Sequence, residues 1–388
     1  MTHFVLVHGM CHGAWCWYKI VSLLKSGGHR VTPLDLGACG INPKTITDLA
    51  SLSDYAQPLM ELMASLPEDE KVILVGHSYG GVFISLAMES FPKKVLAAVY
   101  VSALMPNHDY PIATGLMEVW FDDGSESPPT RALFGPKYTE TKVYHLSPKE
   151  VSLASQKSGH RVTPLDLGAS GINPKTITDL ASLSDYAEPL MALMASLPQD
   201  EKVILVGHSY GGVIISLAME SFPMKVLAAV YLTAFMPNHD SPIATGVAEY
   251  FRRVMAEPLR DFQLLFEDGS ENPPTHALFG PKYMEAMVYQ LSPKEDIELA
   301  NTLLRQGKWF MKDLSKESLL SKEKFGSVDR VYIVCKDDLL IKESLQKWYI
   351  ENSPTDDVKV IAGADHMAMF SKPQEVCKCL QEVAEKYN

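Results

Sequence analysis

The sequence predicts an α/β fold in which a mainly parallel, doubly wound sheet is covered by helices on both faces. Short apolar runs rich in Val, Ile and Leu recur along the chain, and each is too short to form a helix. Helix-length segments separate these runs, and continuous apolar strands that alternate with helices indicate a parallel sheet that is buried on both sides. The hydrophobic content of 46% and the charged content of 21% over 388 residues are ordinary for a globular protein.

The elements follow from these runs and the segments between them. Strands are expected, in chain order, at Phe4–Val7, Val31–Leu36, Val72–Val75, Ala97–Val101, Val331–Val334 and Val358–Ile361. Helices are expected at Leu52–Leu66, Gly80–Glu89 and Gln374–Tyr387. The Pro-rich stretches Ser125–Pro136 and Ser270–Pro281 indicate loops within an inserted cap.

Part of the chain is present twice. Residues 29–114 recur at 160–245, a shift of 131, and ten positions differ between the two copies. After a gap, the match resumes with FGPKY at 134–138 and 279–283, and ends with SPKE at 147–150 and 292–295. Two long units do not fit a solenoid, which stacks at least three short repeats. Removing the shift of 131 from 388 leaves 257 residues, the size of one α/β enzyme domain with part of its core duplicated.

Composition excludes several classes of protein. The net charge of −12 and the lack of a basic run argue against nucleic-acid binding, because phosphate contacts need clustered cations. No apolar run approaches 18 residues, so no membrane span is expected. The first residues enter a strand-like run directly and show no signal-peptide pattern, and six scattered cysteines do not form a disulfide scaffold. We therefore expect a soluble, cytoplasmic protein.

The strongest chemical motif is GHSYGG, which occurs at residues 76–81 and again at 207–212. Each occurrence follows the strand-like run KVILV and precedes a helix-like segment, which is the setting of a G-x-S-x-G nucleophile elbow. The glycines permit a tight, strained turn that lifts the serine above the sheet, and the helix N-terminus favours developing negative charge. Ser78 and Ser209 are thus candidate nucleophiles, and a structural glycine turn is the alternative interpretation.

A second motif, HGMCHG at residues 8–13, follows the first expected strand directly. A glycine-bearing loop at a strand end can aim backbone N–H groups at an oxyanion. The expected donors are the N–H of Met10 and the N–H that follows the serine, from Tyr79 or Tyr210. The alternative is a glycine turn with a buried His12, which we interpret as structural in either case.

The third feature is an acid and a base near the C-terminus. Asp338 follows the run RVYIVCKD and His366 lies in GADHM, both at expected strand ends and in the chain order Ser, Asp, His. A serine nucleophile needs a base to accept its proton, and the imidazole needs a carboxylate to fix its tautomer. The neighbouring Asp337 and Asp365 are interpreted as solvated surface acids.

No cofactor or metal is expected. Cys377 and Cys379 are two residues apart on an expected helix and so point to different sides, unlike a metal site. Neither a G-x-G-x-x-G nor a Walker loop accompanies the strands, which disfavours nucleotide cofactors.

The chain resembles the plant methylesterase and hydroxynitrile lyase family of α/β hydrolases, which includes salicylate-binding methylesterases and polyneuridine aldehyde esterase. The resemblance rests on HFVLVHGMCHGAWCWYK, DEKVILVGHSYGG, LFGPKY, RVYIVCKDD, GADHMAM and EVCKCLQEVAEKYN, with the middle of the chain represented twice. It implies a six-stranded, mainly parallel sheet, a cap over the site, no metal and a Ser-Asp-His triad. Carried over by motif, the triad is Ser78 or Ser209 with Asp338 and His366.

Two chemistries compete within this family. The resemblance implies that lyase members carry Thr at the position of Met10 and Lys directly after the catalytic histidine, where this chain has Met367. Neither methionine can bind a cyanohydrin oxygen or stabilise cyanide. Met367 matches the esterases, whereas Met10 matches neither group and narrows the pocket.

We therefore expect a carboxylesterase that hydrolyses methyl esters of small plant-hormone-like acids, such as methyl salicylate, methyl jasmonate or methyl indole-acetate. A small-molecule ester is the expected substrate, and neither a nucleic acid nor a membrane is an expected partner. The alternatives are a hydroxynitrile lyase and a catalytically weak protein that binds a small ligand in the same apolar pocket. Ester turnover, as opposed to binding without turnover, separates the first hypothesis from the last.

Three parts are expected along the chain. Residues 1–27 hold the first strand and the oxyanion loop, 28–156 the first copy of the core with a shortened cap, and 157–388 the second copy with a full cap and the Asp and His strands. Short connections favour pairing of the first strand with the first copy, whereas joining 1–27 to 159–388 gives an intact domain with the first copy looped out.

Ser209 is favoured over Ser78, because the full cap and the acid and base strands follow it directly. The copy left unpaired would expose apolar strands, which favours self-association, for example as a homodimer.

Overall fold

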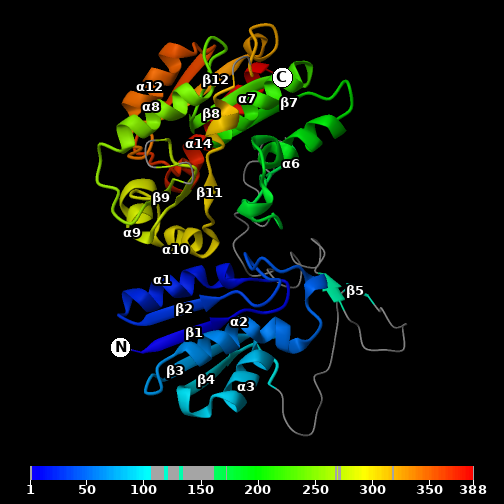
Figure 1. Ribbon diagram of the computed structural model, residues 1–388, viewed down its shortest axis with the longest axis vertical. Coiled ribbons are helices and arrows are strands. Elements are labelled where there is room, and N and C mark those ends of the chain that lie inside the picture. The colour runs from blue at the N-terminus through cyan, green and yellow to red at the C-terminus, as the bar shows by residue number, and fades with distance from the viewer. Residues whose placement is uncertain are drawn as a thin grey trace. The chain divides into compact units, whose positions relative to one another are not determined.

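The computed structural model describes residues 2–105, 118–120, 131–133, 161–171, 173–266, 269, 272–316 and 319–387. It divides into two compact units, unit 1 from Met1 to Arg161 and unit 2 from Val162 to Asn388 (Figure 1). The cap loop expected at Ser125–Pro136 in the first copy falls largely outside the described residues, as do the motifs at 134–138 and 147–150.

Unit 1 contains a four-stranded parallel sheet in the order β2-β1-β3-β4. Its strands are β1 (His3–Val7), β2 (Arg30–Leu34), β3 (Val72–His77) and β4 (Val95–Val101), and a separate antiparallel pair consists of β5 (Glu118–Trp120) and β6 (Arg131–Leu133). Its helices are α1 (Tyr18–Ser26), α2 (Leu52–Ser65) and α3 (Gly80–Ser90), with short 3-10 turns η1 (Ala14–Trp17), η2 (Ile46–Asp48) and η3 (Pro92–Lys94).

Unit 2 contains a second four-stranded parallel sheet, in the order β13-β12-β8-β7. These strands are β7 (Val203–Ser209), β8 (Val226–Ala234), β12 (Arg330–Cys335) and β13 (Asp357–Ile361). A small antiparallel sheet is formed by β9 (Gln263–Leu265), β10 (His276–Leu278) and β11 (Gly307–Lys308).

The helices of unit 2 are α6 (Leu183–Ser196), α7 (Gly211–Ser221), α8 (Ala244–Val254), α9 (Pro281–Tyr283), α10 (Lys294–Leu303), α11 (Met311–Leu314), α12 (Glu343–Asn352), α13 (Ala368–Ser371) and α14 (Pro373–Tyr387). Short 3-10 turns are η6 (Ile177–Asp179), η7 (Pro223–Lys225) and η9 (Phe325–Ser327), and η8 (Met284–Val288) is a π-helical turn.

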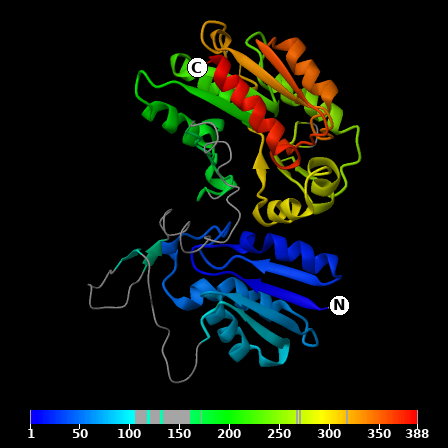
Figure 2. The ribbon, with the colours of Figure 1, turned by 180° about the vertical axis from the view of Figure 1, so that it is seen from behind.

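Helices cover both faces of each sheet, which confirms the doubly wound α/β fold. In unit 2, Val230 and Leu232 of β8 pack in one cluster with Val376 of α14, which crosses one face of the sheet in Figure 2. The alternate residue Tyr231 packs with Ile214 of α7 on the other face. Successive side chains of a strand point to opposite faces, so the uninterrupted apolar runs are buried from both sides.

The strands and helices expected from the sequence are present, but they form two four-stranded sheets rather than the single six-stranded sheet that the resemblance implies. The parallel sheet of unit 1 has the first strands of the expected order, and its last strand along the chain is β4. The parallel sheet of unit 2 begins with β7, the copy of β3, and continues to the C-terminal strands. The duplicated strand pair therefore serves once as the end of one sheet and once as the beginning of the other.

The second copy of β2 does not form a strand. The sequence RVTPL forms β2 at Arg30–Leu34, yet the identical residues 161–165 form no strand. In unit 1 this segment pairs along its whole length with β1, and unit 2 has no copy of β1. Val162 and Leu165 are accordingly 56% and 41% exposed. Local sequence is the same in both places, so the presence of a pairing partner decides the outcome.

The first strand pairs with the first copy. β1 lies between β2 and β3, so the arrangement that joins residues 1–27 to 159–388 is not the one in this structure. β7 is consequently the edge of its sheet, and Val206 on it is 46% exposed.

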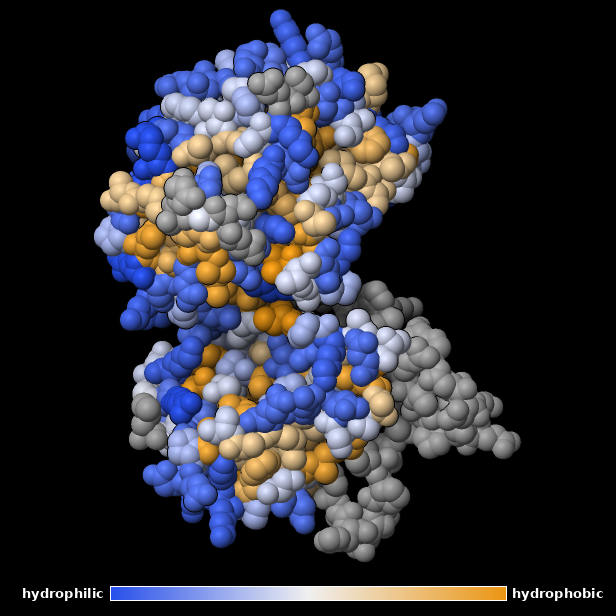
Figure 3. All heavy atoms as spheres, viewed as in Figure 1, coloured by the Kyte–Doolittle hydropathy of each residue, from blue (hydrophilic) through white to orange (hydrophobic). Residues whose placement is uncertain are grey.

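Figure 3 shows apolar side chains on the surface of unit 1 in the region where Figure 1 draws β3 and β4. Strand β4, also an edge, exposes Leu96, Val99 and Val101.

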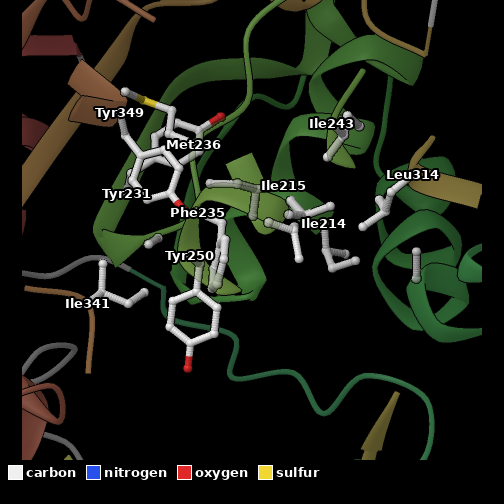
Figure 4. Close-up of a cluster of buried hydrophobic side chains, with 14 of the residues drawn as sticks. Ile214, Ile215, Tyr231, Phe235, Met236, Ile243, Tyr250, Leu314, Ile341 and Tyr349 are labelled. Carbon is white, nitrogen blue, oxygen red and sulfur yellow. The ribbon is translucent and has the colours of Figure 1, made fainter. Parts of the chain in front are cut away.

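The larger hydrophobic core belongs to unit 2. Figure 4 shows part of it, where Tyr231, Phe235 and Tyr250 lie together and Ile214 and Ile215 of α7 face them. Helix α7 begins two residues after Ser209, so this core fixes the position of the candidate nucleophile.

Candidate active site

Both candidate nucleophiles occupy strained elbows. Ser78 and Ser209 have φ angles of 51° and 54°, in the left-handed region that residues with side chains rarely adopt. Ser78 directly follows β3 and Ser209 is the last residue of β7, and in both copies a helix begins two residues after the serine. The turn needs glycine, because a Cβ on Gly207 would lie 2.7 Å from the carbonyl oxygen of Gly211. This geometry matches the expected nucleophile elbow in both copies.

The candidate acid and base form a buried pair in unit 2. Asp338 Oδ2 lies 2.8 Å from His366 Nδ1, and both side chains are almost fully buried. Asp338 Oδ1 accepts hydrogen bonds from the backbone N–H groups of Leu340 and Ile341, at 2.7 and 2.9 Å. A carboxylate can only accept here, so neutral His366 carries its proton on Nδ1 and leaves Nε2 as the basic nitrogen.

A second histidine forms a hydrogen bond with the backbone of this pair. His208, which directly precedes Ser209, donates from Nε2 to the backbone carbonyl of His366 at 2.8 Å. The two imidazole rings lie 4.6 Å apart between centroids. Burial, reinforced by the nearby His366, lowers the pKa of His208 to about 3, so this imidazole is neutral at physiological pH. The residue beside Ser209 thus fixes the backbone of His366.

The predicted oxyanion loop lies against the other serine. A Cβ built on Gly9 would lie only 2.8 Å from Ser78 Cβ, so the loop and the elbow of unit 1 touch. His8 braces this loop: its Nδ1 donates to the Gly9 carbonyl at 2.8 Å and its Nε2 accepts from the N–H of Leu36 at 3.1 Å. Burial lowers the pKa of His8 to about 4, which keeps it in this neutral form.

The predicted site residues are therefore divided between the two units. Ser209, Tyr210, Asp338 and His366 belong to unit 2, whereas Met10, Ser78 and Tyr79 belong to unit 1. Each unit has a nucleophile elbow, and the acid and the base both belong to unit 2. Their catalytic roles stay predictions.

Sequence reasoning misjudged one acid beside the site. Asp365 is completely buried, not a solvated surface residue as expected. Its side chain accepts hydrogen bonds from Leu291 N–H, Ser292 Oγ and Ser371 Oγ at 2.9, 2.8 and 2.7 Å. Asp365 therefore ties the loop that carries His366 to the segment before α10. Its position directly before the base was the only available signal, and Asp337, which has a similar position, is exposed as expected.

Aromatic side chains that the sequence did not single out gather beside Ser209. The Tyr210 hydroxyl donates to the backbone carbonyl of Trp309 at 2.7 Å. The Trp309 ring lies 4.9 to 6.1 Å, between centroids, from the rings of Phe251, Tyr210, Tyr250 and Phe235. These residues come from segments far apart in the sequence, so only the fold brings them together. They give the surroundings of Ser209 an apolar character.

No metal site or membrane span emerges from the described part of the chain. No group of three or more His, Cys, Asp or Glu side chains there could hold a metal ion. The helices described here are also all too short or too polar to cross a membrane.

Comparison with known proteins agrees with this fold. The model of the alpha/beta hydrolase fold matches residues 2–127, and that of the Alpha/beta hydrolase family matches residues 142–378. Methyl jasmonate esterase 1 of Vitis vinifera is 49% identical over 240 residues, which cover 62% of this chain and 92% of that protein. Salicylic acid-binding protein 2 of Nicotiana tabacum is 48% identical over 233 residues, or 60% of this chain and 90% of the relative.

Norfluorocurarine synthase 1 of a Strychnos species is 33% identical over 385 residues, covering 99% of this chain and 96% of the relative. Among solved structures, polyneuridine aldehyde esterase is 29% identical with a TM-score of 0.44, covering 99% of each chain. Tomato methylketone synthase I complexed with 2-tridecanone is 32% identical with a TM-score of 0.43, covering 100% of this chain and 99% of the other. The matched family models and the relatives of high identity establish that this chain belongs to the α/β hydrolase family.

Proposed function

We propose that this protein is a carboxylesterase that hydrolyses methyl esters of small plant-hormone-like acids, with methyl jasmonate, methyl salicylate and methyl indole-acetate as candidates. The observation that carries the proposal is the buried Asp338–His366 pair, joined at 2.8 Å in the unit that also contains the strained elbow of Ser209. The names of the relatives, among them a methyl jasmonate esterase, a methylesterase and polyneuridine aldehyde esterase, support this substrate class.

In this mechanism Ser209 Oγ attacks the ester carbonyl while His366 Nε2 accepts its proton. Asp338 holds the imidazole by Nδ1 and stabilises the positive charge that forms on it. The tetrahedral intermediate collapses, His366 returns the proton to the departing methoxide, and methanol leaves an acyl-enzyme. A water molecule then attacks the acyl-enzyme with His366 as base, which releases the acid and restores the serine.

The negative oxygen of the intermediate needs backbone donors. The N–H of Tyr210, directly after the nucleophile and at the start of α7, is the first proposed donor. Met10, the other donor expected from the sequence, belongs to unit 1, where a Cβ on its neighbour Gly9 would contact the elbow of Ser78. The aromatic side chains around Trp309 and Phe235 provide apolar surface suited to an aromatic or cyclic acyl group.

The setting of this activity is part of the proposal. All six cysteines are free thiols, which suits a reducing compartment such as the cytoplasm. The exposed edge strands β4 and β7 favour self-association, and we propose a homodimer that acts in plant-hormone metabolism.

The duplicated elbow offers a matched pair of variants to test the mechanism. Ser209→Ala in the full chain is expected to lower kcat/KM for methyl jasmonate or a p-nitrophenyl ester at least a thousandfold, since removal of a serine nucleophile costs orders of magnitude in kcat. Ser78→Ala is the control and is expected to retain activity. A fluorophosphonate probe followed by peptide mapping identifies the labelled serine directly.

Two results would contradict this proposal. If Ser78→Ala abolishes activity and Ser209→Ala does not, the first copy provides the nucleophile. If the esters bind without turnover, the protein is a ligand-binding relative of the esterases.

A further inference from the structure

Asp338 has a side-chain partner that the triad does not account for. Its Oδ2, the oxygen that faces His366 Nδ1, also accepts a hydrogen bond from Thr233 Oγ1 at 2.5 Å. Thr233 lies near the end of β8 and is completely buried. With the two backbone donors on Oδ1, both carboxylate oxygens are held, and the one that serves the histidine is held by Thr233.

Thr233 occupies this position at the expense of backbone strain. Its φ is 38°, and a β-branched residue with positive φ is a genuine outlier. The next residue is fixed from both sides, because the Tyr332 hydroxyl accepts from Ala234 N–H at 3.1 Å and donates to the Ala234 carbonyl at 2.8 Å. The N–H of Phe235 in turn donates to the carbonyl of Ser209 at 3.0 Å. These bonds hold the strained turn against the elbow.

Comparison of the two copies shows whether the backbone strain depends on the hydroxyl contact. Ser102 is the counterpart of Thr233 in the first copy, and its φ is 44°. The turn is thus strained in unit 1 as well, although Asp338 belongs to unit 2. Strain is therefore a property of this turn in both copies, and the bond to the carboxylate is what Thr233 adds.

We propose that Thr233 is a positioning residue of the triad: its hydroxyl aligns Asp338 Oδ2 with His366 Nδ1. This inference rests on the proposed esterase function. The hydroxyl has two effects on the carboxylate. It restricts rotation of the carboxyl group, so that Oδ2 points to the imidazole, and it shares the negative charge of Oδ2, which moderates the stabilisation of the imidazolium.

Three variants of the full chain test this role. Thr233→Val keeps the β-branched shape but lacks the hydroxyl, and is expected to lower kcat about ten- to a hundredfold with KM changed less than twofold. Without the hydroxyl the carboxylate holds the imidazolium proton more tightly, so the acid limb of the kcat/KM profile moves to higher pH. Thr233→Ser, which restores the residue type of the first copy, is expected to stay within threefold of the parent. Ser102→Ala is the control and leaves kcat unchanged.

The positioning role is overturned if the kcat of Thr233→Val stays within threefold of the parent. It is also overturned if Thr233→Ser loses as much activity as Thr233→Val, because the loss would then come from packing and not from the hydroxyl. Circular dichroism establishes that each variant is folded. A readout without turnover keeps this test separate from the esterase proposal: the NMR resonance of the His366 Nδ1 proton should shift in Thr233→Val and not in Thr233→Ser. An unchanged resonance in both variants overturns the positioning role even if the parent hydrolyses no ester.

Discussion

Replacing Gly80 and Gly211 by alanine, one at a time, tests which copy receives the first strand. Both are the first residue of a helix, α3 or α7, and both lie in the same sequence SYGGV. Neither has a positive φ, so alanine fits both backbones. The surroundings differ. A Cβ at Gly80 would lie 2.5 Å from the Val7 carbonyl oxygen and 2.7 Å from that of His8, whereas a Cβ at Gly211 meets no described atom within 4 Å.

The expected magnitude follows from this difference. An ordinary contact of a Cβ begins near 3.4 Å, so β1 or α3 must move by about 0.9 Å to accept alanine at Gly80. Overpacking of this kind costs about 1–3 kcal/mol in a well-packed core. The gain in helix propensity from glycine to alanine is at most about 1 kcal/mol, and it cancels because the two positions are equivalent. Gly80→Ala should therefore be about 1–3 kcal/mol less stable than Gly211→Ala.

Hydrogen exchange measured by mass spectrometry assigns the loss to a unit. In Gly80→Ala, amide exchange of the β1 and β3 peptides should accelerate about five- to 150-fold, the factor that corresponds to 1–3 kcal/mol. In Gly211→Ala, exchange of the β7 peptides should be unchanged or slower. Equal effects of the two substitutions would refute the reasoning. A larger effect of Gly211→Ala would mean that β1 pairs with β7, as in the arrangement that joins 1–27 to 159–388.

Three further outcomes are expected. His366→Ala should abolish ester hydrolysis, because the chain has one base of this kind; activity within threefold of the parent would remove His366 from the triad. The parent should cleave p-nitrophenyl esters but release no cyanide from mandelonitrile, since Met10 and Met367 offer neither a hydroxyl nor a cation; serine-dependent cyanide release would reverse this. Because burial lowers the pKa of His8 from 6.5 to about 4, unfolding takes up a proton between these values. The free energy of unfolding of unit 1 should be highest above about pH 6.5 and should fall by up to about 3 kcal/mol as the pH is lowered to 4. Proteolysis within β1 that is equally slow at pH 7 and at pH 4.5 would contradict this expectation.

Some features of this protein could be predicted from the sequence because their determinants are local. The apolar runs are buried strands, and GHSYGG forms a strained elbow in both copies because its glycines permit the turn wherever a strand leads into a helix. Asp338 and His366 each follow a parallel strand, and the carboxyl ends of such strands lie at one edge of a sheet. Their approach to 2.8 Å thus follows from chain order and fold class.

The tertiary structure decided what identical sequences left open. RVTPL has the same local preferences at 30–34 and 161–165, and VILVGHS has the same preferences at 72–78 and 203–209. These segments therefore do not determine which copy β1 joins, although the short connection favoured the first. Strand pairing is a non-local interaction, and one β1 can fill only one of two equivalent edges. For the same reason, the sequence did not predict the contact of Thr233 with Asp338 or the burial of Asp365. Both depend on residues more than 70 positions away that only the folded chain brings into contact.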